Sequence, residues 1–564
     1  MKGLFFFNGG AVSHDEGYRV LNLDFEGGGV AQTGVVAGND VSDISMCNLT
    51  INAFSSGVYV AGSNNGGTVT GYCTGSGSLG DPYVCPGQQA RISLRGSTIT
   101  NNAQMGYLGG CDQCSVQYNH FEFNGGTDAS VHGIYYGGVE PTVGGVTNEG
   151  WATGEIIQGN EIIDSRPSGG SCNGVQLVVH GSHNRMQITD NTLQITGGHS
   201  TGGCYGISAV SGNPYAESIK NLLIARNTII SPGYIGIQVQ TTQGAVIENN
   251  LILVDGPSTA AISSGQSFTS NSEDDDAPSP DGITQVTATG TIIRNNTVYF
   301  NDGSNSASRQ GVFIGGGGRD YVVANNAIYN VSSSNGFQCY QFQAGSAVLT
   351  GGPISTTLSN YTGITNGAFD ITINGVLRHI TGINLSIAPQ SHATPKSMNG
   401  VATAVKAALQ TVIPGSFAQW TGTAVEITTA AATTATTITA ASAPTTGGTD
   451  VSALLGLTAG TGATVGSTYA SVDYNQCYAP SVSSFAWDNS TGLSFSSWKS
   501  ALGFDTHSLN AAPGFTLSGM SGYDFTPATG SVLIGAGNAT YGAATDYYNN
   551  TRPVPPDIGA FQHS

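Results

Sequence analysis

Two short phrases alternate through the first 330 residues of the chain, and their order constrains the fold more than any other feature. In the first phrase an apolar residue follows two positions after Asn, as in Asn160-Glu-Ile, Asn227-Thr-Ile and Asn296-Thr-Val. In the second phrase Gly begins a short apolar stretch, as in Gly206-Ile-Ser and Gly236-Ile-Gln. Short strands in a fixed order, with loops of variable length between them, predict a parallel β-helix in which each coil stacks ~4.8 Å above the last.

The recurrent Asn is expected to hold one turn of every coil. Stacked side-chain amides can bond to one another and to the backbone of the turn. The alternative is a β-sandwich in which Asn only marks the turns. The strict alternation of the two phrases favours the β-helix.

The charge balance excludes several classes of protein. The chain has 564 residues, of which 82 are Gly, and its formal net charge is −19 with only 9% charged residues. So acidic a chain lacks the basic surface that nucleic acids require, and its few charged residues argue against a coiled coil. No apolar run reaches the roughly 18 residues of a membrane-spanning helix. We therefore expect neither nucleic acid nor a membrane among its partners.

The end of the chain carries a further set of characteristic residues, namely Trp498, Gly503-Phe504-Asp505, Pro513, Ser531-Val-Leu-Ile and Asp557-Ile-Gly-Ala-Phe. With the alternating phrases, this ending resembles the pectin-lyase-like right-handed parallel β-helix superfamily over about residues 15–343 and again over 471–564. The resemblance implies an all-β fold, a right-handed parallel β-helix (solenoid). The superfamily includes polysaccharide lyases, hydrolases, epimerases, binding proteins and phage tailspikes, so the resemblance leaves the chemistry open.

Between residues 344 and 470 the composition changes to Ala, Thr and Gly, and apolar residues at helical spacing predict a helix over residues 397–409. This stretch resembles a small α+β module of bacteriophage tail proteins. We predict a β-helix over 1–343, an inserted α+β domain over 344–470, and a C-terminal completion and capping segment over 471–564. The resemblance implies an extracellular or virion-associated protein, with a homotrimer or other phage tail components as its assembly partners.

Nine cysteines raise the question of disulfide bonds. Three pairs fit a bridge between neighbouring coils, a bridge at the base of the insert and a bridge within an early loop: Cys172–Cys204, Cys339–Cys477 and Cys73–Cys85. The alternative is reduced, buried thiols. A single Cys111-Asp-Gln-Cys114 motif without a second pair is weak evidence for zinc.

Side chains in the strands of the Gly phrase alternate between the interior and the exterior. With Ile134 and Val175 facing inward, the outward row consists of aromatic, amide and hydroxyl residues: Tyr59, Tyr135, Gln176, Ser208, Gln238 and Phe313. Aromatic rings stack on the apolar faces of sugars, and amides bond to sugar hydroxyls. The row predicts a polysaccharide-binding groove, and the alternative is an ordinary exposed sheet.

Titratable residues concentrate in the loops beside this row. The chain has only 10 His, yet His132, His180, His183 and His199 fall in adjacent predicted coils. Long loops on a rigid scaffold often carry function. The same loops contain Asp128, Glu140, Glu149, Trp151, Asp164, Arg166, Arg185 and Tyr205.

β-Elimination of a uronic-acid-containing polysaccharide would use these residues in three roles. It needs a base, an acid for the leaving oxygen and a cation that neutralises the carboxylate. The candidates are His132 or His180 as base, Tyr135 as acid or base, and Arg166 or Arg185 as cation. Substrate contacts are predicted for Tyr59, Trp151, Gln176, Arg185, His199, Tyr205 and Gln238.

Two other functions compete with this lyase. A glycoside hydrolase needs two carboxylates facing the bond, and Asp128, Asp164, Glu140 and Glu149 are the candidates. The outward row carries no carboxylate and no adjacent Asp pair of the polygalacturonase kind, which favours the lyase. A non-catalytic receptor-binding protein would need aromatics and amides but no titratable cluster.

Metal binding has little support in the sequence. The acidic run at residues 273–276 predicts an exposed loop that could take Ca²⁺, although its spacing is not that of an EF-hand. A net charge of −19 repels a polyanionic substrate unless Arg or Ca²⁺ compensates locally. No metal ligands and no other cofactor are predicted.

Overall fold

The structure is a computed structural model of the chain. It describes residues 3–6, 15–29, 32–38, 41–61, 90–125, 132–139, 142–143, 146–147, 150–165, 175–196, 204–210, 217–255, 259–265, 288–301, 309–315, 318–331, 336–343, 347–386, 398–414, 416–421, 423–429, 437–463, 469–480, 482, 484–488 and 491–563.

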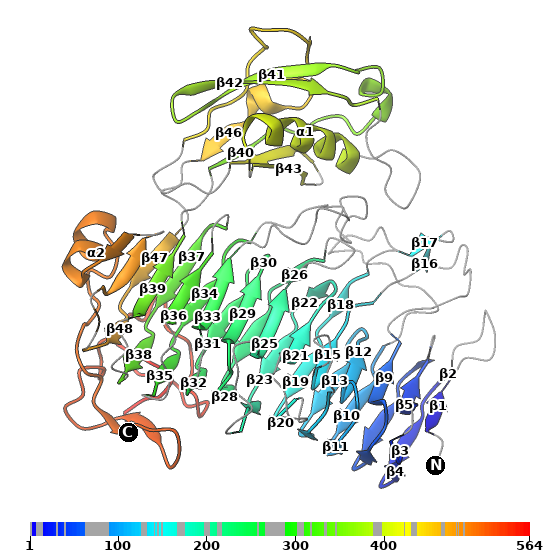
Figure 1. Cartoon of the computed structure of the whole chain (residues 1–564), viewed down its shortest axis with the longest axis vertical. Helices are drawn as coiled ribbons and strands as arrows, with labels where there is room; N and C mark the ends of the chain where they lie inside the picture. Colours follow the sequence, from blue (N-terminus) through cyan, green and yellow to red (C-terminus); the bar gives the residue numbers. More distant parts are fainter. Residues whose placement is uncertain are drawn as a thin grey trace.

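Three long parallel sheets form the walls of a β-helix (Figure 1). The first sheet contains β1 (Leu4–Phe6), β5 (Thr33–Ala37), β9 (Ser56–Val60), β12 (Tyr107–Gly109), β15 (Ile134–Tyr136), β21 (Val175–Val179), β25 (Tyr205–Val210), β29 (Ile235–Gln240), β33 (Ala260–Gly265), β36 (Arg309–Ile314), β39 (Phe337–Phe342) and β49 (Ala486–Asp488), with β50 (Thr491–Leu493) added antiparallel.

The second and third sheets have eleven strands each. The second contains β3 (Arg19–Leu21), β7 (Ser45–Cys47), β10 (Ser93–Arg95), β13 (Ser115–Gln117), β19 (Ile156–Gln158), β23 (Gln187–Thr189), β27 (Leu223–Ala225), β31 (Val246–Glu248), β34 (Ile292–Arg294), β37 (Tyr321–Ala324) and β47 (Tyr469–Asp473). The third contains β4 (Asp24–Glu26), β8 (Thr50–Asn52), β11 (Thr98–Thr100), β14 (His120–Glu122), β20 (Glu161–Ile163), β24 (Thr192–Gln194), β28 (Thr228–Ile230), β32 (Leu251–Val254), β35 (Thr297–Phe300), β38 (Ala327–Asn330) and β48 (Gln476–Tyr478).

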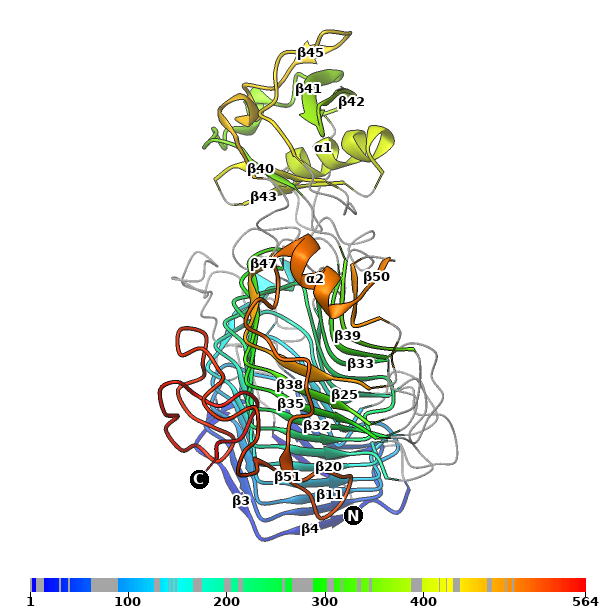
Figure 2. The same cartoon turned by 90° about the vertical axis from the view of Figure 1, so that its left-hand side faces the viewer.

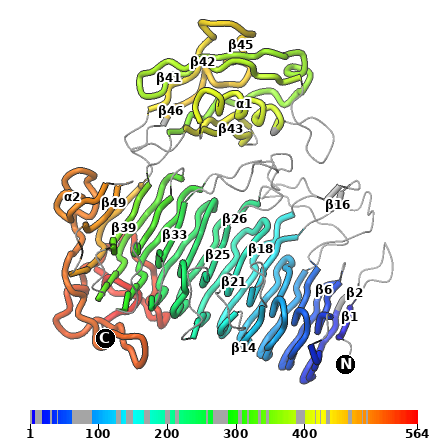
Figure 3. The backbone as a smooth tube through the Cα atoms, in the orientation of Figure 1, coloured from blue at the N-terminus to red at the C-terminus, as the bar shows by residue number. Residues whose placement is uncertain are grey.

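Each coil visits the three sheets in the same order, for example through β21, β23 and β24 before the chain returns to the first sheet at β25. Figure 2 shows the coils end-on, and the tube in Figure 3 shows that coils adjacent in space follow one another in sequence. A short four-stranded sheet bridges the first and second sheets in four coils and contains β18 (Ala152–Thr153), β22 (His183–Asn184), β26 (Ile219–Lys220) and β30 (Thr242–Gln243). Two further pairs are β2 (Asp15–Glu16) with β6 (Val41–Ser42), and β16 (Thr142–Val143) with β17 (Val146–Thr147). The predicted parallel β-helix is confirmed.

Apolar side chains of the three walls fill the interior in vertical rows. In the second sheet Ile188 pairs with Ile224, which pairs with Ile247, and all three are fully buried. In the third sheet Leu193, Ile229 and Ile252 form the equivalent row. Each row places β-branched and other apolar residues directly above one another, and this arrangement suits the half-buried surface of a strand.

The predicted Asn ladder is present at the turn between the second and third sheets. From Asn160 onward, each Asn Oδ1 accepts hydrogen bonds from the backbone N–H and the side-chain Nδ2 of the Asn one coil below, and the amide-to-amide distances are 2.9–3.0 Å. Each Nδ2 also donates to a backbone carbonyl, as Asn227 does to Ile188 at 2.9 Å. The ladder consists of Asn119, Asn160, Asn191, Asn227, Asn250, Asn296, Asn326 and Asn475.

The insert folds around its own core as a small α+β unit, as predicted. Its elements are β40 (Val348–Thr350), the 3-10 helix Leu358–Asn360, β41 (Gly367–Ile373), β42 (Val376–Ile383), α1 (Met398–Val412), β43 (Phe417–Trp420), β44 (Val425–Thr428), β45 (Thr449–Asp450), the 3-10 helix Leu457–Ala459 and β46 (Thr461–Ala463). Val401, Val405 and Leu409 of α1 are fully buried in this core. The guanidinium of Arg319, which follows β36 in the β-helix, lies 3.7 Å from the carboxylate of Glu426 on β44. No helix among the described residues is long and apolar enough to cross a membrane.

The C-terminal segment first completes the β-helix through β47, β48 and β49 and then packs along the outside of the third sheet (Figure 2). It contains α2 (Phe495–Leu502) and the hairpin of β51 (Phe515–Leu517) and β52 (Asp524–Pro527). Phe525 and Phe561 are buried against the outward side chains of Leu253 and Tyr299. Ile252, between Leu251 and Leu253, faces the interior, so this segment covers the opposite face of the strand.

The predicted Cys339–Cys477 disulfide is present, with 6.0 Å between the Cα atoms. Cys111 and Cys114 are also bonded to each other, which excludes the zinc alternative for this motif. Cys204 is disulfide-bonded, but its predicted partner Cys172 lies outside the described residues, as do Cys73 and Cys85. Among the cysteines that the structure describes, Cys47 is free.

The Cys339–Cys477 bond closes a loop that contains the whole insert, with a sequence separation of 138 residues. Because a cross-link restricts the unfolded chain more as the loop grows, replacing both cysteines by Ala is expected to lower the free energy of unfolding by about 2–4 kcal/mol. Denaturant unfolding of the double variant measures this effect, with Cys47→Ala as the control. An unchanged midpoint in the double variant would contradict the expectation.

Asp505 follows α2, near the C-terminal end of the β-helix, and is fully buried. It accepts hydrogen bonds from the indole N–H of Trp498 at 2.8 Å, from Asn475 Nδ2 at 3.2 Å and from the Ser508 hydroxyl at 2.5 Å. Burial raises the pKa of the Asp505 carboxyl to about 6, although these hydrogen bonds lower it. The ionised form of this carboxyl group therefore destabilises the fold relative to its protonated form.

This raised pKa predicts a pH effect of definite sign. The stabilisation from the protonated Asp505 is complete below the unfolded pKa of about 4 and is lost as the pH rises to about 6. When the pH rises from 4 to 7, the unsubstituted protein should therefore lose roughly 2–3 kcal/mol more of its free energy of unfolding than the Asp505→Asn protein loses. Urea unfolding at the two pH values tests this, with the exposed Asp24→Asn as control. Equal pH dependence in both proteins would refute the assignment.

Candidate functional site

The outward face of the first sheet carries the predicted row of side chains, with one change of register. Pairing places Tyr135 beside Val178, Val178 beside Ser208, and Ser208 beside Gln238. The full row is Phe5, Val36, Tyr59, Leu108, Tyr135, Val178, Ser208, Gln238, Ser263, Phe313, Gln341 and Trp487. The Ser208 hydroxyl donates to Gln238 Oε1 at 3.0 Å, so polar groups follow the aromatic Tyr135 along the face.

The prediction that Gln176 belongs to this row is wrong. Ile134 pairs with Leu177 rather than with Val175, so Gln176 aligns with Gly206 of the next coil. A Cβ on Gly206 would lie only 2.8 Å from the interior Ile229, which shows that this column faces inward where the strand bends. Gln176 is accordingly fully buried, and within the described residues neither atom of its amide has a hydrogen-bond partner.

His132, Tyr135 and His180 lie close together around the paired strands β15 and β21. Tyr135 points outward from β15, and its ring centroid lies 5.7 Å from that of His132 and 5.4 Å from that of His180. His132 lies two residues before the start of β15, and His180 directly follows β21. The backbone N–H of His180 donates to the carbonyl of Tyr136 at 2.9 Å, which continues the pairing of β15 with β21 past their ends.

Hydrogen bonds assign different proton positions to the two imidazoles. The backbone N–H of Val175 donates to Nδ1 of His132 at 3.1 Å, so the neutral ring carries its proton on Nε2. Burial, and the neighbouring His180 as a second cause, lowers the pKa of His132 to about 4. His132 is therefore a neutral hydrogen-bond donor at neutral pH, with its lone pair occupied by the backbone.

His180 has the opposite arrangement. Its Nδ1 lies 3.2 Å from Oε2 of Glu217, which is buried just before β26. Because a carboxylate only accepts, Nδ1 carries the proton, and the lone pair on Nε2 of the neutral ring has no partner among the residues that the structure describes. The imidazole of His180 can thus accept a proton while the carboxylate of Glu217 fixes its orientation.

Behind His180 lies a fully buried ion pair. Nδ1 of His183 is 2.6 Å from Oε1 of Glu155, and Nε2 of His183 is 2.8 Å from the backbone carbonyl of His180. Both neighbours are acceptors, so both ring nitrogens donate and the imidazole is charged. Burial alone would lower the pKa of His183, but the charge and hydrogen bond of Glu155 together with the carbonyl of His180 raise it. The pair holds the backbone of His180 in place.

Three of the other predicted substrate residues lie on strands of the first sheet, namely Tyr59 on β9, Tyr205 on β25 and Gln238 on β29. Tyr205 on β25 is half-buried, and its ring meets that of Tyr234 edge-on at 5.2 Å. Burial, reinforced by Tyr234, raises the pKa of Tyr205 to about 12. Gln238 lies on the outward row, and Tyr59 lies on the same row two strands before Tyr135.

Asp164 and Trp151 are placed differently from the expectation. Asp164 is buried with φ 45° and accepts hydrogen bonds from the backbone N–H and hydroxyl of Thr196, so it stabilises a turn and is not an open catalytic carboxylate. Trp151 is only 2% exposed, and the Lys220 ammonium lies 5.3 Å from its ring centroid. It therefore has almost no surface for a sugar. Arg185 is exposed in the turn between β22 and β23, and the predicted residues Asp128, Arg166, His199, Glu140, Glu149 and 273–276 lie outside the described residues.

Glu155 and Glu217 were not among the residues singled out from the sequence. Each lies in the chain far from the histidine that it contacts, and only the stacking of coils brings them together. Among the described residues no group of three or more His, Cys, Asp and Glu side chains is arranged to hold a metal ion.

Comparison with known proteins gives a family match for the insert. Residues 344–471 match the family model of the insert domain of the E217 tail sheath protein gp31. Comparison with curated proteins gives no match. Among solved structures, the tailspike protein of E. coli bacteriophage HK620, determined in complex with a pentasaccharide, is similar at 12% sequence identity and a TM-score of 0.31, over 66% of this chain and 72% of that chain.

Proposed function

We propose that the protein is a virion-associated phage tail component that binds a uronic-acid-containing polysaccharide on the outward row of the first sheet and cleaves it by β-elimination. The family match of the insert to a tail sheath insert domain supports the virion location. One observation carries the chemistry. The Tyr135 ring lies within 6 Å of two imidazoles, that of His180 with a lone pair on Nε2 and that of His132 with a proton on Nε2, and neither Nε2 has a hydrogen-bond partner among the described residues.

In this proposal His180 is the base. Its Nε2 takes the proton from C5 of the uronic acid, and the electrons left behind form the C4–C5 double bond while the C4–O bond breaks. The leaving oxygen takes the proton of the Tyr135 hydroxyl, so the reaction produces one unsaturated end and one new hydroxyl end without adding water. Glu217 stabilises the imidazolium that forms, as a carboxylate does beside a histidine base.

The expected role of His132 changes from base to donor. Because Val175 occupies its Nδ1, the Nε2–H of His132 can donate to the substrate carboxylate, where negative charge develops as C5 loses its proton. Charge neutralisation by Arg166 or Arg185 stays a prediction. The two described carboxylates that contact the cluster, Glu155 and Glu217, are each bound to a histidine, and this favours the lyase over a two-carboxylate hydrolase.

The test is to incubate the protein with a panel of uronic-acid polymers and to follow both the ultraviolet absorbance of unsaturated ends and the formation of reducing ends. The lyase predicts that both rise together. New reducing ends without absorbance would instead indicate a hydrolase. Binding without either signal would indicate a receptor-binding protein that holds its polysaccharide intact.

A further inference from the structure

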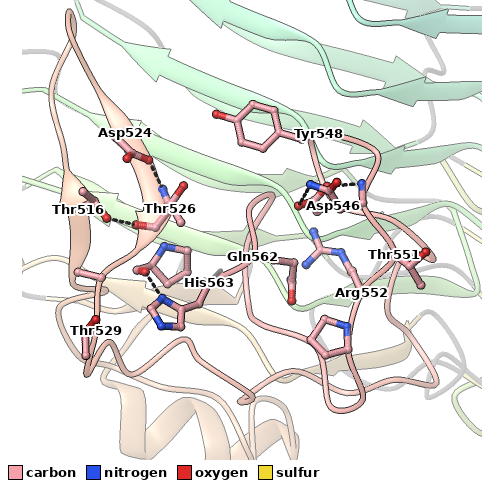
Figure 4. Close-up of a pocket in the computed structure, with 14 residues that line it drawn as sticks. Thr516, Asp524, Thr526, Thr529, Asp546, Tyr548, Thr551, Arg552, Gln562 and His563 are labelled. Carbon is pink, nitrogen blue, oxygen red and sulfur yellow. Dashed lines mark hydrogen bonds between the residues drawn. The ribbon is translucent and has the colours of Figure 1, made fainter.

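The C-terminal segment contains a cavity of about 1010 Å³, far from the cluster around Tyr135 (Figure 4). The cavity lies in the part of the chain that packs outside the third sheet, whereas Tyr135 lies outside the first sheet. It is lined by Thr516, Asp524, Thr526, Pro527, Ala528, Thr529, Asp546, Tyr548, Asn550, Thr551, Arg552, Pro553, Gln562 and His563. Its volume is in the range of cavities that hold small ligands.

Arg552 makes the wall of this cavity rigid. Its guanidinium donates to Oδ1 of Asn249 at 2.6 Å and to the backbone carbonyls of Gly559 and Ala560, both at 2.9 Å. Its Nε donates to the carbonyl of Thr545 at 2.9 Å. These bonds tie the last residues of the chain to the β-helix, so the cavity is formed before any ligand arrives.

Several polar atoms on the wall are held in place yet keep bonding capacity. Oδ1 of Asp524 accepts from the N–H of Thr526 at 2.9 Å, and this leaves its other oxygen to accept further bonds. Nδ1 of His563 donates to the carbonyl of Pro527 at 2.9 Å, so its Nε2 can accept. Asp546 differs from these two, because it is only 2% exposed and both of its oxygens accept from Asn550, Oδ1 from the backbone N–H at 2.7 Å and Oδ2 from Nδ2 at 3.3 Å. Figure 4 shows Asp524 and Asp546 on opposite sides of the cavity.

Tyr548 supplies an aromatic surface beside these groups. It is 63% exposed, and its ring is braced by Phe561 at 5.5 Å and by Tyr547 at 5.4 Å. A large exposed ring that is fixed from behind is the form in which proteins stack on the apolar face of a sugar. Burial, together with the charges of Asp524 and Asp546, raises the pKa of the Tyr548 hydroxyl.

The charge of the lining selects among sugars. Asp524 and Asp546 are acidic, and the one guanidinium, Arg552, directs its donors to the protein. A uronic acid would meet two carboxylates without a free cationic partner, and this disfavours a polyanion. Neutral sugars offer hydroxyl donors to the carboxylates and an apolar face to Tyr548.

We infer that this cavity is a second carbohydrate-binding site, which takes neutral sugar residues and is separate from the cleavage site on the first sheet. A neutral sugar stacks on Tyr548 and donates hydroxyl hydrogen bonds to Asp524 and His563. Because the two sites lie on different faces of the β-helix, the second site can hold the bacterial surface while the first acts on the polysaccharide. This role needs binding only and no chemical step.

The test is binding to a printed array of neutral and uronic-acid-containing oligosaccharides. All proteins carry Tyr135→Ala, which weakens binding at the first sheet, and only the part of the neutral-sugar binding that the substitutions at Tyr548 and Asp524 reduce is assigned to the cavity. The starting protein is expected to bind neutral oligosaccharides, and Tyr548→Ala should reduce this affinity at least tenfold. Asp524→Asn should reduce it several-fold, because an amide accepts sugar hydroxyls less strongly. Val554→Ala is the matched control, since Val554 is 82% exposed and does not line the cavity.

Two results would overturn the inference. One is that the protein carrying Tyr135→Ala binds no neutral oligosaccharide on the array. The other is that neutral binding persists in both the Tyr548→Ala and Asp524→Asn proteins. Neither result bears on the proposed lyase, which is measured by product formation. Thermal unfolding of each variant verifies that the exposed substitution leaves the fold intact.

Discussion

Tyr135→Phe and His180→Ala are each expected to lower the rate of polysaccharide cleavage by about 10²–10⁴-fold, the usual contribution of a positioned acid or base. Phe keeps the ring that lies 5.4 Å from His180 and loses only the proton donor. Ala at position 180 removes the lone pair oriented by Glu217. Initial rates under saturating substrate measure the loss, and affinity for the polysaccharide should change only a few-fold.

The control for this experiment is Tyr118→Phe, which removes a phenol that is 49% exposed away from the outward row. It should cleave at the unsubstituted rate. Glu217→Gln provides a finer test, because it retains a hydrogen-bonding group at Nδ1 of His180 but removes the charge that stabilises the imidazolium. We expect an intermediate loss of rate and a shifted pH profile. Full activity of either Tyr135→Phe or His180→Ala would rule out the assigned roles.

Asn227→Ala should lower the free energy of unfolding by about 3–5 kcal/mol, a large effect for one polar side chain. Asn227 Oδ1 accepts two hydrogen bonds from Asn191, both of 3.0 Å, and its Nδ2 donates to the carbonyl of Ile188 and to Asn250. Removing it leaves several buried donors and acceptors without partners, each at a cost of about 1–3 kcal/mol. Denaturant unfolding measures the change.

The matched control is Gln187→Ala, which removes an exposed amide from β23 beside the same coil. Its unfolding should shift by no more than about 0.5 kcal/mol, as for most surface substitutions. If Asn227→Ala were as mild as this control, the amide ladder would not stabilise the coil and the apolar rows alone would hold it.

The fold could be predicted from the sequence because its signals are local and repeated. An Asn at one turn of each coil and apolar residues two apart are visible without any knowledge of neighbouring coils. The position of Gln176 could not be predicted in this way. Alternation predicts which face a residue occupies only where the strand is straight. Here the strand bends at the column of Gly206, and the pairing register between coils places Gln176 on that column.

The candidate site could be predicted only in part, because only some of its residues belong to the repeated pattern. Tyr135, His132 and His180 lie at the ends of the repeated strands, so their proximity follows from the coil. Glu155 and Glu217 lie in connections of irregular length, and the register of those connections is not encoded in the repeats. The donor role of His132 depends on a hydrogen bond from Val175 of the next coil, which the sequence pattern does not specify.

The C-terminal cavity was missed because the residues that build it resemble those of a capping segment. Asp524, Tyr548 and His563 are widely separated in the chain and meet only where the segment folds back on the third sheet. The homotrimer stays a prediction, as does a Ca²⁺ role for residues 273–276.

The most direct test of the proposed chemistry is cleavage of a uronic-acid polymer in water enriched in ¹⁸O, followed by mass spectrometry of the fragments. β-Elimination adds no water across the cleaved bond, so we expect fragments with an unsaturated end and no more ¹⁸O than a reducing sugar takes up by exchange with the same water. Saturated ends, with one ¹⁸O at each new reducing end from the start of the reaction, would show hydrolysis and would contradict the assignment of His180 and Tyr135 as base and acid of a lyase.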